Sequence, residues 1–415
     1  MIDSSLSRRG ALGVVGGGAL ALSACSPATK SIRPNLIIWH AFRGGEKAAL
    51  EKLCALYSSR LKPGQRPVRA VAVPSDAIAD KISAAVPRGK GPDLFIFGHD
   101  RLGGWVESGN TIAALDFFLE DEFKAGFLPN MFEATTYKGA TWALPFNYKS
   151  ITLLYNKALV PVPPKTVEEM EAMSQKLTNQ ARGRFGMVYA YDDFFFHAAL
   201  MNGYGGGPFD ATGKLILNSP ENIRASDLVQ RWKRDLAILP DDPTASLVSS
   251  LFNSGRAAMI FNGPWFLGEI SDKIDYGAAV LPSITAAGGR PLSPFMAVEA
   301  IFISAGTHDQ AEAWAFAKFL TSLEAAKIMA VEGGELPTLK AVYDEAEVAA
   351  NPITRAYKDQ ALSAVAMPNR PEMTMVWSPA DKAMKRVTKL ETTSKVAWDD
   401  CQREVQGAID ALRAS

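Results

Sequence analysis

The sequence predicts an α/β protein of two domains with largely parallel sheets. Strand-like and helix-like patterns alternate along the chain, which is typical of parallel strands joined by helices. The 415 residues are enough for two domains. Turn-rich segments interrupt the chain, but none is a long flexible linker between two halves. We therefore expect the chain to cross between its domains more than once.

The first elements can be placed by their apolar patterns. Residues 35–42 and 69–74 read as two strands. A third strand covers 94–97, where the absence of polar alternation indicates burial on both faces. The helix after the first strand has one apolar face, formed by Leu50, Leu53, Cys54, Tyr57 and Leu61.

Two helices are expected in the last third of the chain. One begins near Asp309, with Thr307 and Gln310 at the spacing of a capping box. The last helix has an apolar stripe formed by Trp398, Cys401, Val405, Ala408 and Leu412. We expect these helices to pack against the core and to have no binding or catalytic role.

Composition and charge narrow the functional class. The chain has 44 basic and 44 acidic side chains and a formal net charge of zero, so we expect no nucleic acid as its partner. No apolar run after residue 30 approaches the roughly 20 residues that span a bilayer. The four histidines are scattered and no Cys-x-x-Cys occurs. This pattern argues against a zinc site, and we expect neither a metal nor another cofactor.

The N-terminus has the layout of an export signal. The pair Arg8-Arg9 precedes a short segment rich in glycine, alanine and leucine, and an L-S-A-C sequence then ends at Cys25. This arrangement resembles a lipoprotein signal that is cut before Cys25, which would then carry a lipid; the paired arginines also resemble a twin-arginine signal. We therefore expect residues 1–24 to be a signal peptide and residues 25–33 a lipid-anchored tether.

The other two cysteines are Cys54 and Cys401, each on an apolar helical face. An exported protein could join them in a disulfide. However, two cysteines this far apart define no disulfide framework. We expect two small, buried hydrophobic side chains.

An enzyme is the alternative from a different functional class. Asp192-Asp193 is a carboxylate pair of the kind that glycoside hydrolases use. Adjacent residues of a strand point to opposite faces, however, and the chain has no G-x-S-x-G, H-E-x-x-H or P-loop motif. We expect a binding protein, with a cell-surface carbohydrate hydrolase as the alternative.

The candidate binding residues favour a sugar. Sugars offer hydroxyl groups to carboxylate and guanidinium groups, and apolar C–H faces to aromatic rings. Asp100 and Arg101 follow the buried third strand, at the carboxyl end where open α/β sheets bind ligands. Trp265 and Trp377 lie beside chain-turning residues, so that their rings can project from loops. His99 is expected to be a structural hydrogen-bonding residue.

Several segments resemble the maltose/maltodextrin-binding proteins of bacterial ATP-binding-cassette (ABC) importers. The segments are GPDLFIFGHDRLGGWVESG, LIIWHAF, GATWALPFNYKSITLLYNKALVPVPPKT, GRAAMIFNGPWFLGEI, YGAAVLPS, PLSPFMAVEAIFIS and MPNRPEMTMVW. They occur in the family's order and at similar spacing from about residue 35 to the C-terminus. The most specific motifs are G-P-D…H-D-R…G-G and N-G-P-W.

The resemblance implies a two-lobed periplasmic-binding-protein fold, in which each lobe is a mostly parallel sheet flanked by helices. Three crossings between the lobes are then expected, near 147–151, 294–299 and 348–352. The N-terminal lobe is expected to comprise 34–147 and 300–348, and the C-terminal lobe 152–293 and 353–415. Closure of the lobes about such crossings is a recognised switching movement.

The resemblance also implies a sugar site. Asp100 and Arg101 fall on a hydrogen-bonding Asp-Arg pair of the family. Trp265 and Trp377 fall on its stacking tryptophans. Asp192 falls on a glutamate that binds sugar hydroxyls.

Four other positions depart from the family pattern. Phe194 replaces a tyrosine and keeps an aromatic surface. Lys149 stands where the family has a sugar-binding glutamate, Arg43 where it has an aspartate, and Asp381 where it has an arginine. A donor in place of an acceptor would leave maltose hydroxyls mispaired, unless these positions lie at the rim and water intervenes.

The expected function is that of an extracytoplasmic sugar receptor of an ABC importer. It would capture maltose-like or maltooligosaccharide-like sugars by hinge closure and deliver them to the membrane permease. Trehalose or an acidic oligosaccharide is the alternative ligand. The protein is expected to be exported to the periplasm or cell surface, held at the membrane by its N-terminal lipid, and monomeric.

Overall fold

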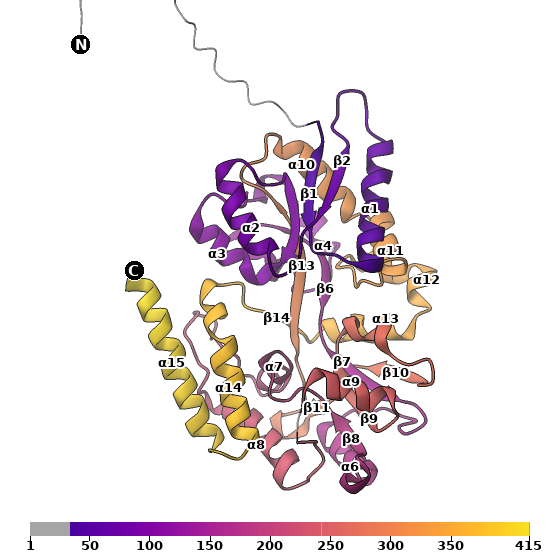
Figure 1. Cartoon of the computed structure of the whole chain (residues 1–415), viewed down its shortest axis with the longest axis vertical. Helices are drawn as coiled ribbons and strands as arrows, with labels where there is room; N and C mark the ends of the chain where they lie inside the picture. The colour runs from indigo at the N-terminus through magenta and orange to yellow at the C-terminus, as the bar shows by residue number, and fades with distance from the viewer. Residues whose placement is uncertain (1–33, 242, 415) are drawn as a thin grey trace, which may run out of the picture. The chain divides into compact units, whose positions relative to one another are not determined.

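The computed structural model describes residues 34–241 and 243–414 (Figure 1). The chain from Pro34 onward forms one compact unit. The predicted signal peptide (1–24), the tether (25–33) and the lipidated Cys25 lie outside the described residues. Within those residues, no helix combines the length and the apolar character that crossing a membrane requires.

The first sheet has six strands and contains the three that the sequence predicts. Its path runs β14-β13-β3-β1-β2, and β6 also pairs with β13. The strands are β1 (Leu36–His40), β2 (Val68–Ala72), β3 (Leu94–Gly98), β6 (Leu144–Lys149), β13 (Phe295–Ile303) and β14 (Val365–Ala366). The pairs β1/β2, β1/β3 and β13/β14 are parallel, whereas β13 is antiparallel to β3 and β6.

Both faces of this sheet are buried, as the apolar sequence of β3 predicts. Leu94 and Ile96 belong to one apolar cluster, and Phe95 between them belongs to another. Phe95 meets Trp105 edge-on, with 5.1 Å between the ring centroids. The accompanying helices are α1 (Gly44–Ser59), α2 (Ile78–Ala85), α3 (Leu102–Ser108), α4 (Asp121–Ala125), α5 (Met131–Thr135), α10 (Gln310–Leu320), α11 (Leu323–Val331) and α12 (Ala346–Ala349).

The second sheet has four strands in the order β10-β7-β9-β8. They are β7 (Thr152–Asn156), β8 (Phe185–Val188), β9 (Ala257–Asn262) and β10 (Tyr276–Ala279). The accompanying helices are α6 (Val167–Leu177), α7 (Phe194–Gly203), α8 (Pro220–Arg234), α9 (Ala245–Asn253), α13 (Pro352–Ala361), α14 (Trp377–Thr388) and α15 (Ser394–Ala414). α14 and α15 lie side by side and pack on α8 (Figure 1).

Short elements complete the described part of the chain. Two small ribbons pair β4 (Thr136–Tyr137) with β5 (Ala140–Thr141) and β11 (Ser283–Ile284) with β12 (Arg290–Pro291). The 3-10 helices are η1 (Val86–Arg88), η2 (His99–Arg101), η3 (Asp116–Phe118), η4 (Gln180–Arg182), η5 (Pro264–Glu269), η6 (Thr285–Ala287), η7 (Lys340–Asp344) and η8 (Pro371–Met375).

The prediction that each sheet is mostly parallel is wrong for the second sheet. Only β8 and β9 pair in parallel there, whereas β7 is antiparallel to both β9 and β10. The reason is the path of the chain. Strands joined by helices within one sheet all end at the same edge, but β7 comes directly from β6 of the other sheet and therefore begins at that edge.

Two predicted helix details also need correction. The cap of α10 is Asp309, whose Oδ1 accepts from the Glu312 N–H at 2.9 Å, while the Thr307 hydroxyl donates to Asp93 Oδ1 at 2.8 Å. On α15 the buried residues include Trp398, Cys401, Val405 and Ile409, whereas the predicted Ala408 and Leu412 are exposed. A spacing of four residues keeps Ile409, and not its neighbour Ala408, above Val405 on the inner face.

Cys54 and Cys401 are both buried and free, as the sequence predicts. Burial raises the pKa of both thiols to about 12. They therefore remain protonated at neutral pH and act as small apolar side chains.

Candidate functional site

The predicted Asp-Arg pair lies at the end of the buried strand β3. Its neighbour His99 is fully buried, accepts at Nδ1 from the Val298 N–H at 3.0 Å, and donates from Nε2 to the Met367 carbonyl at 2.7 Å. This confirms His99 as a structural residue that holds η2 in place. Asp100 is half-buried, and Arg101 Nε lies 3.7 Å from its Oδ2. Burial raises the pKa of Asp100, and the charge of Arg101 partly offsets this rise.

Lys149 lies at the centre of a cluster of carboxylates. It ends β6 opposite Ala297 of β13, and Glu299 lies two residues farther along β13 on the same face. Lys149 Nζ donates to Glu299 Oε1 at 3.0 Å. Carboxylate oxygens of Glu46 and Glu335 lie 3.7 and 3.9 Å from Nζ. We refer to Lys149, Glu46, Glu299 and Glu335 as the Lys149 cluster.

Two Gly-Gly-Glu turns bring Glu46 and Glu335 together. Glu46 follows Gly44-Gly45 at the start of α1, and Glu335 follows Gly333-Gly334 after α11. A Cβ on Gly45 would lie 3.1 Å from the Glu332 carbonyl oxygen, so glycine permits the close approach of the two turns. The chain thereby places two acidic side chains beside Lys149.

The groups of the Lys149 cluster do not titrate alike. Burial opposes the Lys149 charge, but the three carboxylates outweigh this effect and raise the Lys149 pKa. Burial raises the pKa of Glu335 well above its ordinary value, and the Glu299 charge adds to the rise. Burial also opposes ionisation of Glu46, but its hydrogen bond with Glu335 and the Lys149 charge lower its pKa. Glu335 therefore keeps its proton to higher pH than its hydrogen-bond partner Glu46.

Trp265 presents an aromatic surface to solvent. It lies in η5, directly after β9, and is 45% exposed. A Cβ on Gly263 would lie 2.1 Å from the indole Cζ3, so only glycine lets the ring lie against the backbone. The Phe195 and Phe196 rings lie 6.1 and 6.5 Å from the indole. The indole is thus held on one side and open on the other, as a stacking surface requires.

Two phenylalanine rings lie between Trp377, the second predicted tryptophan, and Trp265. Trp377 begins α14 and is partly buried. Ring centroids are 6.1 Å apart from Trp265 to Phe195, 6.4 Å from Phe195 to Phe295, and 6.2 Å from Phe295 to Trp377. The two tryptophans therefore belong to one continuous series of aromatic contacts.

Phe194 and Asp381 contact each other at the start of α7. Phe194 is fully buried and meets the Phe295 and Trp377 rings edge-on, so its aromatic surface is not exposed in this conformation and its role in binding stays a prediction. Phe194 is the first residue of α7, whose cap is Asp193, and the Asp193 side chain accepts from the Phe195 N–H. Asp381 Oδ1 accepts from the Phe194 N–H at 2.8 Å and so supports the start of α7. Asp192 is half-buried just before this helix.

Arg43 lies at the entrance of α1, beside the Lys149 cluster. Its side chain is exposed and Nη2 lies 3.2 Å from the Ser75 hydroxyl oxygen. Its backbone N–H donates to Glu46 Oε2 at 3.4 Å. Arg43 is therefore a rim residue next to the cluster and is not part of its innermost contacts.

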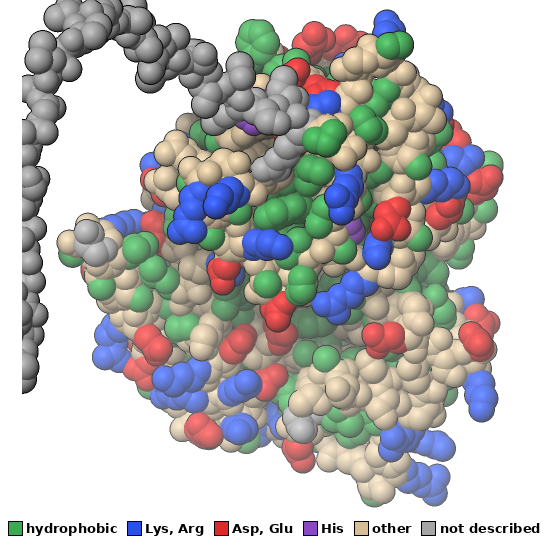
Figure 2. All heavy atoms as spheres, turned by 45° about the horizontal axis from the view of Figure 1, so that its top comes forward, with side chains coloured by type: hydrophobic (Ala, Val, Ile, Leu, Met, Phe, Trp, Pro, Cys, Tyr) green, Lys and Arg blue, Asp and Glu red, His purple; other side chains and the backbone are tan. Residues whose placement is uncertain are grey.

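A hollow of about 360 Å³ brings Lys149 and Trp265 together. Its walls include Glu46, Lys149 and Glu335 from the elements of the first sheet and Trp265 and Tyr357 from the elements of the second. This volume lies within the range of about 300–1,000 Å³ that is usual for small-molecule sites. On the face in Figure 2, hydrophobic side chains gather in a hollow across the middle of the molecule, with charged side chains along its margins.

Residues 62–356 match the family model of the bacterial extracellular solute-binding proteins. The chain belongs to this family. The members of this family are solute-binding proteins and not a family of enzymes.

Comparisons with individual proteins point to oligosaccharide binders. A maltotriose-binding protein from Pyrococcus abyssi is 29% identical over 382 residues, which cover 90% of this chain and 83% of that protein. A galactooligosaccharide-binding protein from Bacillus subtilis is 24% identical over 413 residues, which cover 95% of each chain. A crystal structure of a cyclo/maltodextrin-binding protein complexed with maltotetraose matches with a TM-score of 0.84 and 28% identity, over 92% of this chain and 98% of that one. The resemblance drawn from the sequence and the two-lobed α/β fold are thereby confirmed.

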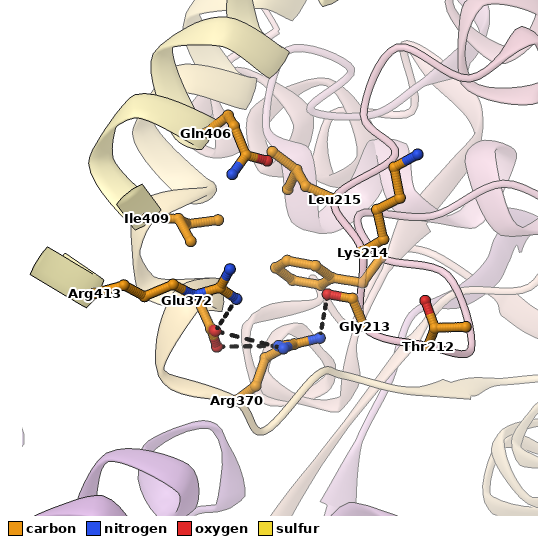
Figure 3. Close-up of a pocket in the computed structure, with 10 residues that line it drawn as sticks. Thr212, Gly213, Lys214, Leu215, Arg370, Glu372, Gln406, Ile409 and Arg413 are labelled. Carbon is orange, nitrogen blue, oxygen red and sulfur yellow. Dashed lines mark hydrogen bonds and ion pairs between the residues drawn. The ribbon is translucent and has the colours of Figure 1, made fainter. Parts of the chain in front are cut away.

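The solute-binding protein has a second hollow, of about 320 Å³, away from the predicted site residues (Figure 3). Glu372 lies between two arginines there: its carboxylate accepts from Arg370 Nε at 3.0 Å and from Arg413 Nη2 at 3.2 Å. Arg370 Nη1 also donates to the Gly213 carbonyl at 2.6 Å. The dashed contacts in Figure 3 show that the charged groups of this hollow bind one another. They connect α15 and the loop at Gly213 to the segment of Arg370 and Glu372.

Sequence reasoning missed the three glutamates of the Lys149 cluster. The signal for Glu46 and Glu335 is the repeated Gly-Gly-Glu, since paired glycines place the next side chain on a tight turn. The signal for Glu299 is a single acidic residue within the apolar strand FMAVEAIFI. Among the described residues, no group of histidine, cysteine, aspartate and glutamate side chains is arranged to hold a metal ion.

The raised pKa of Glu335 predicts how the stability of the folded protein changes with pH. In the unfolded chain Glu335 loses its proton above its ordinary pKa of 4.5, whereas the folded protein keeps it to higher pH. Stability from this group therefore falls as pH rises from about 4.5 through the folded pKa. In Glu335→Gln the amide replaces the protonated acid, so we expect the melting temperature of the variant to rise relative to wild type as pH increases from 4.5 to 8. A difference in melting temperature between Glu335→Gln and wild type that stays the same at every pH would contradict the raised pKa of Glu335.

Proposed function

We propose that the chain is the sugar receptor of an ABC importer and that it captures maltose-like or maltooligosaccharide-like sugars. The observation that carries this proposal is the hollow that Lys149 and Trp265 share. It offers an exposed indole to the apolar face of a sugar, and carboxylate and ammonium groups to its hydroxyls. The oligosaccharides that the relatives bind have both kinds of surface.

Capture would require closure of the two lobes. The hollow has walls from both sheets, so a bound sugar would contact both lobes at once. Only such differential contact shifts the equilibrium toward a closed state. We propose lobes of 34–147 with 300–348 and of 152–293 with 353–415. The direct passage from β6 to β7 and the passage from α12 to α13 would serve as two of the three hinges.

The Lys149 cluster favours a neutral sugar over an acidic one. The Lys149 charge already has carboxylate oxygens at 3.0, 3.7 and 3.9 Å. A uronic acid would bring another negative charge to carboxylates that are only partly neutralised, which is unfavourable in a partly buried site. We therefore propose that Lys149 orients the glutamates toward sugar hydroxyls, and that it does not replace them as the ligand group.

We propose that export and anchoring deliver the receptor to its permease. Residues 1–24 would direct export and be removed, and Cys25 would carry the lipid that holds the chain at the membrane. Loss of lipid labelling in a Cys25→Ser variant would be expected. We further propose that the receptor acts as a monomer and leaves its sugar intact.

Calorimetric titration tests the function with one panel of sugars. The chain from Ser26 onward keeps every described residue and can be titrated with maltose, maltotriose, trehalose, a galactooligosaccharide and a uronic-acid disaccharide. Heat from the malto-sugars is expected, with micromolar dissociation constants, which correspond to binding free energies of about −8 kcal/mol. Binding confined to the galactooligosaccharide would instead indicate the ligand of the Bacillus subtilis relative. Release of new reducing ends during the titration would indicate a hydrolase and overturn the receptor proposal.

A further inference from the structure

Two carboxyl groups face the hollow of Lys149 and Trp265 as a pair. Glu46 and Glu335 both line this hollow, and their side chains are hydrogen-bonded to each other. An ionised carboxylate has no proton to donate, so this bond requires a proton on one of the two groups. When the bond is formed, the pair therefore carries one proton and one negative charge.

The surroundings of the pair favour this protonated form. Lys149 is the cation of the cluster, and its Nζ lies closest to a third carboxylate, Glu299 Oε1 at 3.0 Å. With all three glutamates ionised, one ammonium group would face three negative charges. The Glu335 side chain is only 5% exposed, and like charges in such a space oppose each other's ionisation. Burial and the Glu299 charge therefore hold the pKa of Glu335 well above its ordinary value.

The other titratable groups around the pair can be separated from it. Burial raises the pKa of Glu299, and the Lys149 charge opposes this rise, but Glu299 does not line the hollow. His40, at the end of β1, interacts with Glu46, and burial lowers the pKa of His40. Tyr357 of α13 lines the hollow, and burial raises its pKa well above 10. His40 and Tyr357 are therefore uncharged from about pH 6.5 to about pH 9.

Two further charged side chains near the pair have their own partners. Glu332 is exposed, and its carboxylate lies 2.6 Å from Lys52 Nζ. Arg43 is also exposed, and its Nη2 lies 3.2 Å from the Ser75 hydroxyl oxygen. Neither Glu332 nor Arg43 lines the hollow. A ligand in the hollow therefore meets the charge of the Glu46–Glu335 pair before it meets theirs.

A bound neutral sugar changes the cost of charge on the pair. A sugar ring in the hollow displaces water from the carboxyl groups that line it, and loss of water opposes their charged form. The pair with one proton offers both a donor and acceptors to sugar hydroxyls, whereas two carboxylates offer acceptors alone. The sugar therefore favours the protonated pair, which keeps its proton to higher pH in the complex than in the free receptor.

We propose that the receptor binds its sugar with one proton on the Glu46–Glu335 pair, so that sugar capture is linked to proton uptake and weakens as pH rises. The inference rests on the proposed function and adds a regulation to the same site. At low pH the pair is protonated with and without sugar, and affinity does not depend on pH. Once the free receptor has lost this proton, binding must restore it, and affinity falls.

Calorimetry with maltotriose from pH 5 to pH 9 tests the linkage. At each pH, two buffers of different ionisation enthalpy give the affinity and the number of protons taken up. We expect the affinity of wild type to be constant at first and then to fall by about tenfold, with uptake of close to one proton where it falls. Glu335→Gln keeps a donor but cannot titrate, so we expect this variant to lose both the pH dependence and the proton uptake.

Glu332→Gln is the matched control. It changes a glutamate three residues earlier in the chain, which is exposed and does not line the hollow. We expect this variant to keep the pH profile of wild type. Glu46→Gln removes the other half of the pair and the repulsion between them, so its proton uptake is expected at lower pH. It replaces Glu335→Gln in the test if that variant proves unfolded by circular dichroism.

The outcomes separate the linkage from the function on which it rests. If no malto-sugar binds wild type at any pH, the proposed ligand class fails and the linkage with it. If maltotriose binds with the same affinity from pH 5 to pH 9 and without proton uptake, the linkage alone fails. A pH dependence that persists in Glu335→Gln would assign the proton to another group and overturn the role of the pair.

Discussion

Replacing Trp265 by alanine is expected to weaken sugar binding by about tenfold or more, the scale of a buried aromatic anchor. The indole is 45% exposed and lines the hollow that it shares with Lys149, so its loss removes apolar contact from a ligand bound there. Trp265→Phe keeps a smaller ring and is expected to lose only part of the affinity. Calorimetry with maltotriose measures both effects.

Phe117 provides a matched control for this prediction. It is the most exposed aromatic side chain of the described residues, at 93%, and lies in η3, which contributes no residue to the hollow of Lys149 and Trp265. Phe117→Ala is expected to leave sugar affinity unchanged. Equal binding by Trp265→Ala and wild type, with both folded, would remove Trp265 from the site.

Replacing Lys149 by methionine is expected to destabilise the folded protein by about 3 kcal/mol, the lower end of the range for broken buried ion pairs. The lower end applies because the Lys149 side chain is 27% exposed. Methionine keeps most of the apolar stem but leaves Glu46, Glu299 and Glu335 without their cation. The carboxylates of Glu46 and Glu299 would then repel each other in a partly desolvated space. Urea unfolding followed by circular dichroism gives the change in stability.

Lys157 serves as the control for a lost surface charge. Its Nζ lies 2.7 Å from Asp275, and both side chains are exposed. Lys157→Met is expected to leave the urea midpoint nearly unchanged, since exposed ion pairs contribute little. If Lys149→Met unfolds at the same urea concentration as wild type, the cluster does not depend on Lys149 as the structure indicates.

The sequence predicted well those features that depend on local pattern. The apolar run of β3 required burial on both faces, and the side chains of Leu94 and Phe95 do enter opposite cores. His99 and the two buried cysteines followed in the same way from their places at the end of a strand or on an apolar helix face.

Features that depend on the path of the chain through space were not predictable in this way. The antiparallel pairs of β7 arise because that strand enters from the other sheet, which no local pattern records. Phe194 has the residue type of a stacking ring, but it is fully buried among Phe295, Trp377 and Trp398, which meet only in the folded chain. The residues of the Lys149 cluster come from α1, β6, β13 and the loop after α11. These segments are far apart in the sequence and meet only in the folded protein.

Hydrogen–deuterium exchange with and without maltotriose tests most directly the claim that a sugar binds between Lys149 and Trp265. The account predicts slower exchange in two segments at once, 262–269 around Trp265 and 333–337 around Glu335, because the shared hollow has walls from both. Slower exchange in only one segment, or in neither while calorimetry reports binding, would place the sugar elsewhere and contradict the proposed site.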